Sequence, residues 1–239
     1  MGSHARAAEY YDLLYSEFKD YEAETARLLH IIGAACPGAR RVLDVGCGTG
    51  RHAGLLAAAG LSVDGLDLEP EFVRIARERN PGGSFRVGDM TSFSVSEPYD
   101  VVLSLFGSIG YAVDEEGLHA AVRCLAEAIR VGGVVIVEPF LEPSDMKDGY
   151  VTMQSARRPD LVVCRMSRTI VRDGVSRIEF EYLVARPGGI EHLSETHELG
   201  LFTEEVMVRA LEGAGLQVTQ DREGLMGRRV YVGRKERPS

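Results

Sequence analysis

A glycine-rich turn between a short apolar run and a helical stretch limits most strongly what this chain can fold into. Residues 42–45 read Val-Leu-Asp-Val, glycines follow at positions 46, 48 and 50, and an amphipathic stretch begins near Arg51. Glycine accepts a positive φ angle and lets a ligand approach the backbone closely. The turn also directs free N–H groups of a helix N-terminus at whatever binds there. The pattern therefore predicts a strand, a tight loop and a helix around a site for a nucleotide or a carboxylate.

The spacing of these glycines differs from that of dinucleotide enzymes, whose fingerprint is Gly-x-Gly-x-x-Gly. Here the third glycine comes one residue early, and Arg51 takes the sixth position. A loop kept only for its turn is the plain alternative. The run from Asp44 to Gly50 resembles motif I of the class I S-adenosylmethionine-dependent methyltransferases. That resemblance implies contacts to the methionine part of the cofactor from Gly46, Cys47, Gly48, Thr49 and Gly50.

Strand-like and helix-like stretches alternate from residue 41 to residue 138. Strands are expected near 42–45, 62–66, 85–87, 99–105 and 134–137, and a long helix carrying Leu118 and Leu125 is expected to stop at Gly132-Gly133. Such alternation implies right-handed crossovers and a parallel sheet. Two further strands, 216–220 and 229–232, are expected to form an antiparallel pair. The prediction is an α/β fold with a Rossmann-like, seven-stranded, mostly parallel sheet.

Residues 150–200 follow a different pattern, with four strand-like runs separated by turns. They predict an antiparallel platform inserted after the fifth strand, for substrate binding, dimerisation or both. The cofactor-binding core would then comprise residues 1–149 and 201–239, with an N-terminal helical cap in residues 1–40.

Several polar residues come directly after predicted strands, where ligands of open α/β sheets bind. Asp67 follows the glycine loop by about twenty residues and can accept both ribose hydroxyls, with a solvated helix-cap acid as the alternative. Asp89 and Met90 resemble the adenine contacts of the methyltransferase family. Tyr11 and Tyr21 resemble tyrosines of a cap that contacts the cofactor carboxylate. The remaining predicted cofactor contacts are Leu68, Leu105 and Phe106.

Longer segments narrow the resemblance. Residues 88–90, 108–111, 132–139, 148–151 and 227–228 are similar to those of N,N-dimethyltransferases that act on thymidine-diphosphate (TDP)-linked amino sugars in antibiotic biosynthesis. The resemblance implies S-adenosylmethionine as cofactor, S-adenosylhomocysteine as product, a homodimer, and substrate contacts from Ser108 and Tyr150. Phe140 and Leu141 stand where that family has paired tryptophans.

Methyl transfer to nitrogen needs a neutral, well-oriented amine more than a strong base. Tyr111, a position that the resemblance turns toward the substrate, is the first candidate to orient the acceptor. Glu138 is the second, with a structural acid as the alternative. His197 shares a strand face with Glu195 and is the third. His192 and His197 are five positions apart on one strand, so the two face opposite sides and no metal site is expected.

Three charged residues are candidate substrate contacts. Arg228 could bind a diphosphate through paired hydrogen bonds, or simply lie at the surface. Arg177 and Glu179 share one strand face. The alternative to a substrate contact is that this face is solvated and the two residues form salt bridges.

Bulk properties exclude several classes of partner. The net charge of −9 argues against nucleic acid. No apolar run is long enough to span a membrane, and four separated cysteines indicate reduced thiols in a cytoplasmic protein. The expected partner is a small molecule, for which a nucleotide sugar is the candidate. The alternatives are an O- or N-methyltransferase of another small metabolite and a cofactor-binding module without catalysis.

Overall fold

The computed structural model describes residues 4–225 and 227–237, and of residues 4–7 only the backbone. The first three residues of the predicted cap lie outside this range. One sheet has the strand order β10-β11-β5-β4-β1-β2-β3, in which β11 alone runs antiparallel to its neighbours. The predicted seven-stranded, mostly parallel sheet is confirmed. Its strands are β1 (Arg41–Val45), β2 (Ser62–Asp67), β3 (Phe85–Val87), β4 (Tyr99–Ser104), β5 (Ile129–Val137), β10 (Leu216–Leu225) and β11 (Arg228–Lys235).

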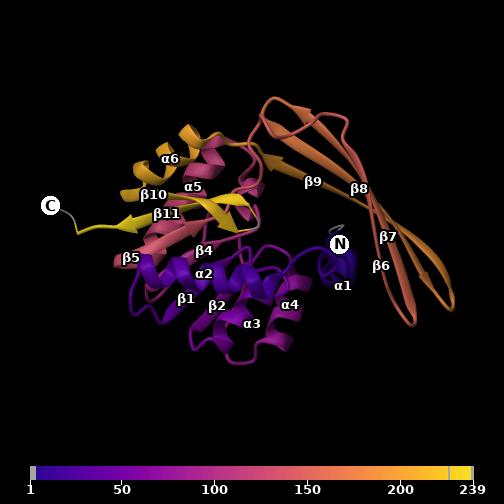
Figure 1. Cartoon of the computed structure of the whole chain (residues 1–239), viewed down its shortest axis with the longest axis horizontal. Helices are drawn as coiled ribbons and strands as arrows, with labels where there is room; N and C mark the ends of the chain where they lie inside the picture. Colours follow the sequence, from indigo (N-terminus) through magenta and orange to yellow (C-terminus); the bar gives the residue numbers. More distant parts are fainter. Residues whose placement is uncertain (1–3, 226, 238–239) are drawn as a thin grey trace.

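Helices cover both faces of this sheet (Figure 1). Leu118 and Leu125 of α5 pack with Met207 of α6 on one face, and Leu28 of α2 packs with Leu56 of α3 on the other. The central strand β4 is buried from both sides, which explains its almost wholly apolar sequence. The helices of the two layers are α2 (Tyr21–Ala35), α3 (Arg51–Ala58), α4 (Pro70–Arg79), α5 (Glu115–Ala128) and α6 (Glu204–Gly213).

The end of α5 differs from the prediction. The helix was expected to continue to Gly132-Gly133, but it ends at Ala128 and β5 begins at Ile129. Lys235 Nζ donates to the carbonyl oxygens of Ala126 and Ile129, at 2.8 and 3.0 Å, and so satisfies carbonyls at the helix end. The contact to Ile129 spans 106 residues of sequence, so a local sequence pattern could not reveal it.

Between β5 and α6 the chain forms a separate sheet, which we call the platform (Figure 1). Its four antiparallel strands are β6 (Val151–Arg158), β7 (Leu161–Arg172), β8 (Val175–Arg186) and β9 (Gly189–Gly200). The N-terminal helix α1 (His4–Tyr15) packs Tyr10 and Leu14 against Val163 and Val184 of the platform. The platform is therefore held next to the carboxyl ends of the main-sheet strands.

Among the residues that the structure describes, no helix combines the length and the apolarity needed to cross a membrane.

Candidate functional site

The glycine loop follows β1 as predicted, and each of its three glycines has a positive φ angle, between 53° and 77°. A Cβ atom on Gly46 would lie 2.6 Å from Ser108 Cβ, and one on Gly50 would lie 2.5 Å from Asn80 Nδ2. A Cβ atom on Gly48 would meet nothing within 4 Å. The loop thus packs tightly behind and leaves the Gly48 backbone open to the space in front of it. This is the surface that a ligand of the backbone would need.

Asp67, the last residue of β2, supports this loop. Its Oδ2 accepts from the N–H of Gly48 at 2.7 Å, and its Oδ1 accepts from the N–H of Glu69 at 2.9 Å. Burial raises the pKa of Asp67 above its ordinary value, although these backbone donors oppose the shift. Each carboxylate oxygen still has a lone pair for a further donor. The ribose hydroxyls of a nucleoside are donors of the required kind.

A cavity of about 410 Å³ extends from the glycine loop to the platform. Most residues predicted from the sequence to bind cofactor or substrate line it. From the core these are Gly46, Cys47, Gly48, Thr49, Asp67, Leu68, Asp89, Met90, Leu105, Phe106, Ser108, Tyr111 and Arg228, with Tyr11 and Tyr21 from the cap and His197 from the platform. The cavity thus joins a wall suited to the cofactor to a wall rich in tyrosine and histidine.

Five predicted site residues do not line the cavity. Gly50 is the N-cap of α3, and Tyr150 is 55% exposed at the base of β6. Arg177 and Glu179 pair with each other on the outer face of β8, where Glu179 also pairs with Arg168. The alternative interpretation, a solvated and salt-bridged face, describes Arg177 and Glu179. The inner face of β8 presents Ile178, Phe180 and Tyr182 to the cavity.

Glu138, the fifth, lies behind the cavity wall at the end of β5. It is 1% exposed, accepts from the N–H of Phe106 at 2.6 Å and lies 2.9 Å from Nη2 of Arg228. Phe106 has a φ angle of 54°, and its ring centroid is 3.7 Å from Lys19 Nζ and 4.8 Å from Arg228 Cζ. Glu138 therefore holds Phe106 and Arg228 in place. This geometry matches the alternative role of a structural acid and not a direct contact with the acceptor.

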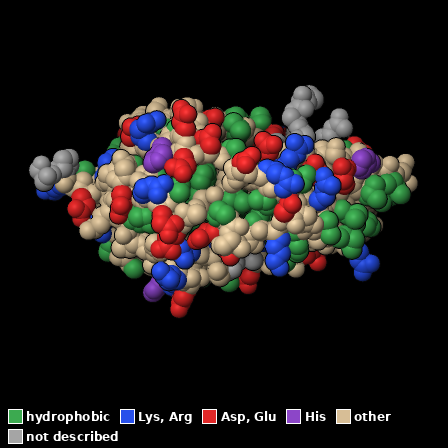
Figure 2. All heavy atoms as spheres, turned by 90° about the horizontal axis from the view of Figure 1, so that it is seen from above, with side chains coloured by type: hydrophobic (Ala, Val, Ile, Leu, Met, Phe, Trp, Pro, Cys, Tyr) green, Lys and Arg blue, Asp and Glu red, His purple; other side chains and the backbone are tan. Residues whose placement is uncertain are grey.

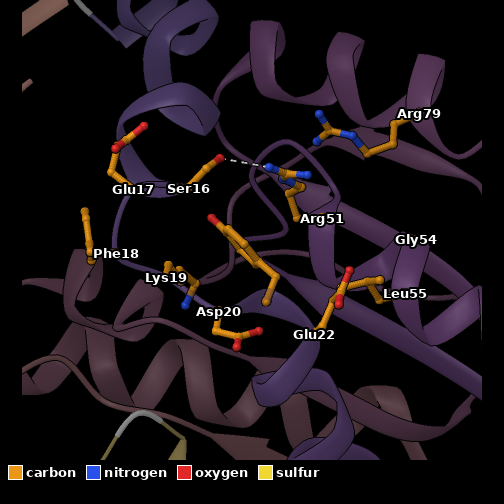
Figure 3. Close-up of a pocket in the computed structure, with 11 residues that line it drawn as sticks. Ser16, Glu17, Phe18, Lys19, Asp20, Glu22, Arg51, Gly54, Leu55 and Arg79 are labelled. Carbon is orange, nitrogen blue, oxygen red and sulfur yellow. Dashed lines mark hydrogen bonds between the residues drawn. The ribbon is translucent and has the colours of Figure 1, made fainter. Parts of the chain in front are cut away.

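Helix α1 covers the cavity and is tied to the glycine loop by Asp12. The Asp12 carboxylate accepts from Thr49 Oγ1 at 2.7 Å and pairs with Arg79 of α4. One turn later, Ser16 Oγ accepts from Arg51 at 3.0 Å, at the edge of a second, open depression (Figure 3). These bonds join segments up to 67 residues apart, so the sequence analysis did not find the role of Asp12.

Two charged residues in the cavity wall, Asp44 and Arg165, were not predicted from the sequence. Asp44 lies at the end of β1, is 2% exposed, and burial raises its pKa to about 6. Arg165 of β7 is 8% exposed, and its guanidinium lies over the rings of Tyr15 and Phe180. Arg165 lies on the apolar face of a strand with alternating polarity. A charge at such a position needs partners, so the sequence pattern could have identified Arg165.

Tyr111 and His197 meet in the half of the cavity nearest the platform. Tyr111 lies in the short 3₁₀ helix η1 (Ser108–Ala112), and its Oη is 2.5 Å from His197 Nδ1. His197 Nε2 is 3.4 Å from Glu195 Oε2, which also accepts from Tyr182 Oη at 3.2 Å. Burial raises the pKa of both tyrosines. Residues from the core and the platform thus form one polar chain at the cavity wall.

Comparison with known proteins agrees with this geometry. Residues 42–133 match the family model described as a methyltransferase domain. The chain is 36% identical to the dTDP-3-amino-3,4,6-trideoxy-alpha-D-glucopyranose N,N-dimethyltransferase of Streptomyces venezuelae, over 95% of this chain and 96% of the relative. It is 38% identical to the dTDP-3-amino-3,6-dideoxy-alpha-D-glucopyranose N,N-dimethyltransferase of Streptomyces fradiae, over 95% of this chain and 89% of the relative.

A solved structure shares the whole architecture. CalS10, a SAM-bound amino pentose methyltransferase of Micromonospora echinaspora involved in calicheamicin biosynthesis, superimposes with a TM-score of 0.82 at 34% identity. The alignment covers 91% of this chain and 92% of that structure. The likeness therefore includes the platform as well as the cofactor-binding sheet.

Proposed function

This chain belongs to the family of the TDP-amino-sugar N,N-dimethyltransferases, and we propose that it methylates the amino group of a TDP-linked amino sugar used in antibiotic biosynthesis. Like its relatives, it is an S-adenosylmethionine-dependent methyltransferase. The observation that carries the proposal is the continuity of the cavity from the glycine loop to Tyr111 and His197. A cofactor on the first wall and an acceptor on the second would meet without any rearrangement of the sheet.

The cofactor would be held by residues of the main sheet and the cap. Asp67 would accept from the ribose hydroxyls, and Asp89 with Met90 would contact the adenine. Tyr11 and Tyr21 would face the carboxylate of the methionine part, next to the open backbone at Gly48. When bound, S-adenosylmethionine supplies an already activated methyl group, so positioning of the acceptor accounts for most of the acceleration.

The acceptor would lie between the glycine loop and the platform. Its amine must be neutral to act as a nucleophile, and Tyr111 is placed to hydrogen-bond it from the cavity wall. Arg228 lines the same cavity and is held at its inner side by Glu138. Its remaining N–H groups are suited to the diphosphate of a nucleotide sugar.

Mass spectrometry tests this proposal directly. TDP-amino sugars incubated with the protein and S-adenosylmethionine are expected to gain one or two methyl masses. Tyr111→Phe is expected to slow the gain about tenfold, which is the loss of one hydrogen bond worth about 1.4 kcal/mol. Tyr150→Phe, on the exposed base of β6, is the matched control and should behave as the wild type. If no sugar nucleotide gains mass while the cofactor binds, the acceptor belongs to another class of amine or hydroxyl compound.

We further propose that the protein is a homodimer formed through the outer face of the platform. Met153, Met166, Leu183 and Ile190 are 55–75% exposed there, and hydrophobic side chains gather at this end of the molecule (Figure 2). A second copy would cover these apolar side chains, which share the outer face with the ion pair of Arg177 and Glu179. In analytical ultracentrifugation, Met166→Glu is expected to shift a dimer to monomer, whereas Val131→Glu, on an exposed position of β5, should leave it unchanged. A monomeric wild-type protein would contradict the proposal.

We also infer that the enzyme acts in the cytoplasm. Its four cysteines are free thiols, and three of them are buried. This is the state that cysteines keep in a reducing compartment.

A further inference from the structure

Glu195 is a buried carboxylate whose hydrogen bonding is incomplete. It lies on the inner face of β9, is 5% exposed and lines the cavity. Its Oε2 contacts Tyr182 and His197, whereas its Oε1 is buried without a hydrogen-bond partner among the described residues. A buried carboxylate with an unsatisfied oxygen destabilises the folded state. Its place in the cavity wall, next to the proposed acceptor position, indicates a use for the carboxylate there.

The partners of His197 define its tautomer. The Glu195 carboxylate can only accept, so Nε2 of His197 carries the proton and points it at Glu195. Nδ1 is then an acceptor, and the Tyr111 hydroxyl donates to it at 2.5 Å. The ring of Phe180 stands edge-on to the imidazole, with centroids 5.1 Å apart. Tyr111, His197 and Glu195 therefore form an oriented chain from the cavity toward the interior of the platform.

We propose that the hydrogen-bonded series Tyr111, His197 and Glu195 removes the proton from the acceptor ammonium before methyl transfer. Glu195 is the positioning residue that stabilises protonated His197. The proposal rests on the proposed function, because an amino sugar enters largely as an ammonium at neutral pH. One N–H bond of the ammonium breaks and its proton joins the Tyr111 oxygen, while the hydroxyl proton of Tyr111 moves to His197 Nδ1. The electron pair stays on nitrogen, and the imidazolium donates from Nε2 to Glu195.

The surroundings favour this direction of transfer. Burial raises the pKa of Tyr111, so its hydroxyl passes a proton on more readily than it ionises. Among the described residues, the charged or titratable groups that face these three side chains include Tyr11 and Tyr15 of α1, Asp67 of β2, Arg165 of β7 and Tyr182 of β8. The Tyr182 hydroxyl donates to Oε2 of Glu195 and holds it in place, and Arg165 lines the same cavity. The His197 side chain is 17% exposed, so it can release the proton to solvent after each methyl transfer.

The pH dependence of Glu195→Gln tests the proposal. The amide keeps the size of the side chain but cannot stabilise an imidazolium by its charge. At pH 7 we expect kcat to fall about tenfold, corresponding to about 1.4 kcal/mol, and the deficit to shrink toward pH 9.5 as the amine loses its proton to solvent. Binding of S-adenosylhomocysteine, measured by calorimetry, should stay within about twofold of wild type, because Glu195 lies on the acceptor wall. Glu198→Gln, an exposed position of the same strand, is the matched control.

A second measurement does not depend on activity. In NMR spectra of ¹⁵N-histidine-labelled protein, the wild type is expected to show His197 with its proton on Nε2, and Glu195→Gln is expected to weaken this preference because the carboxylate acceptor is lost. An unchanged tautomer preference of His197, or a pH profile of kcat parallel to that of the wild type, would overturn the proposal. Failure of the wild type to methylate any amino sugar would instead reject the proposed function. If Glu195→Gln does not fold, His197→Asn breaks the chain at its partly exposed member, and the same pH series decides.

Discussion

Replacing Asp67 with alanine is expected to raise the dissociation constant of S-adenosylhomocysteine about 100-fold, the effect of losing about 2.7 kcal/mol. The carboxylate accepts from the N–H groups of Gly48 and Glu69, so its removal frees the glycine loop. It would also remove the acceptor for the ribose hydroxyls. A hydrogen bond to a charged group contributes about 1.5–3 kcal/mol. The expected loss of about 2.7 kcal/mol therefore corresponds to one or two such bonds between Asp67 and the ribose hydroxyls. Calorimetric titration of the purified variant measures the effect.

Two further variants separate the causes of this loss. Asp67→Asn keeps an acceptor oxygen for one N–H group and is expected to bind with an affinity between those of the wild type and the alanine variant. Glu78→Gln removes an exposed carboxylate from α4 and should leave binding unchanged. If Asp67→Ala binds within about threefold of wild type, Asp67 is a helix-cap acid and not the ribose acceptor.

The arrangement of the main sheet was predictable because its signals are local. Three consecutive features give the strand, the loop and the helix. They are the apolar run before Gly46, the three glycines and the amphipathic stretch from Arg51. Asp67 and Asp89 follow directly from their positions after strands. Residues at the carboxyl ends of parallel strands meet at one edge of a sheet, so the prediction of a common rim required only the strands themselves.

The platform was harder to interpret, although its four strands were predicted. Alternation showed that Arg177 and Glu179 share one face of β8 and that Ile178 and Phe180 share the other. It did not show which face looks into the cavity, because that depends on how α1 packs Tyr10 and Leu14 on the platform. The role of Glu138 was undecided for a similar reason. Its partners Phe106 and Arg228 are 32 and 90 residues away in the sequence, and their proximity is a property of the fold.

The buried carboxylate of Asp44 is expected to lower the stability of the folded protein at neutral pH, although it is expected to help bind the cofactor. Burial raises the pKa of Asp44 to about 6 in the folded protein, whereas an unfolded aspartate has a pKa of about 3.9. Between these values the folded state binds a proton that the unfolded state has released. The contribution of Asp44 to stability therefore falls as the pH rises from about 4 to about 6, and is constant above that. The difference corresponds to about 3 kcal/mol.

Asp44→Asn has no charge to desolvate and is expected to stabilise the ligand-free protein by up to about 3 kcal/mol at pH 8, with no gain at pH 4. Binding of S-adenosylhomocysteine should weaken, because Asp44 lies in the cavity wall beside the glycine loop and this ligand carries an ammonium in its amino-acid part. Denaturant unfolding at both pH values, with and without S-adenosylhomocysteine, measures both effects. Asp160→Asn, an exposed carboxylate of the platform, should change neither. A variant that is less stable than the wild type at pH 8 would contradict the elevated pKa. A more stable variant with unchanged affinity would show that Asp44 does not face the cationic part of the ligand.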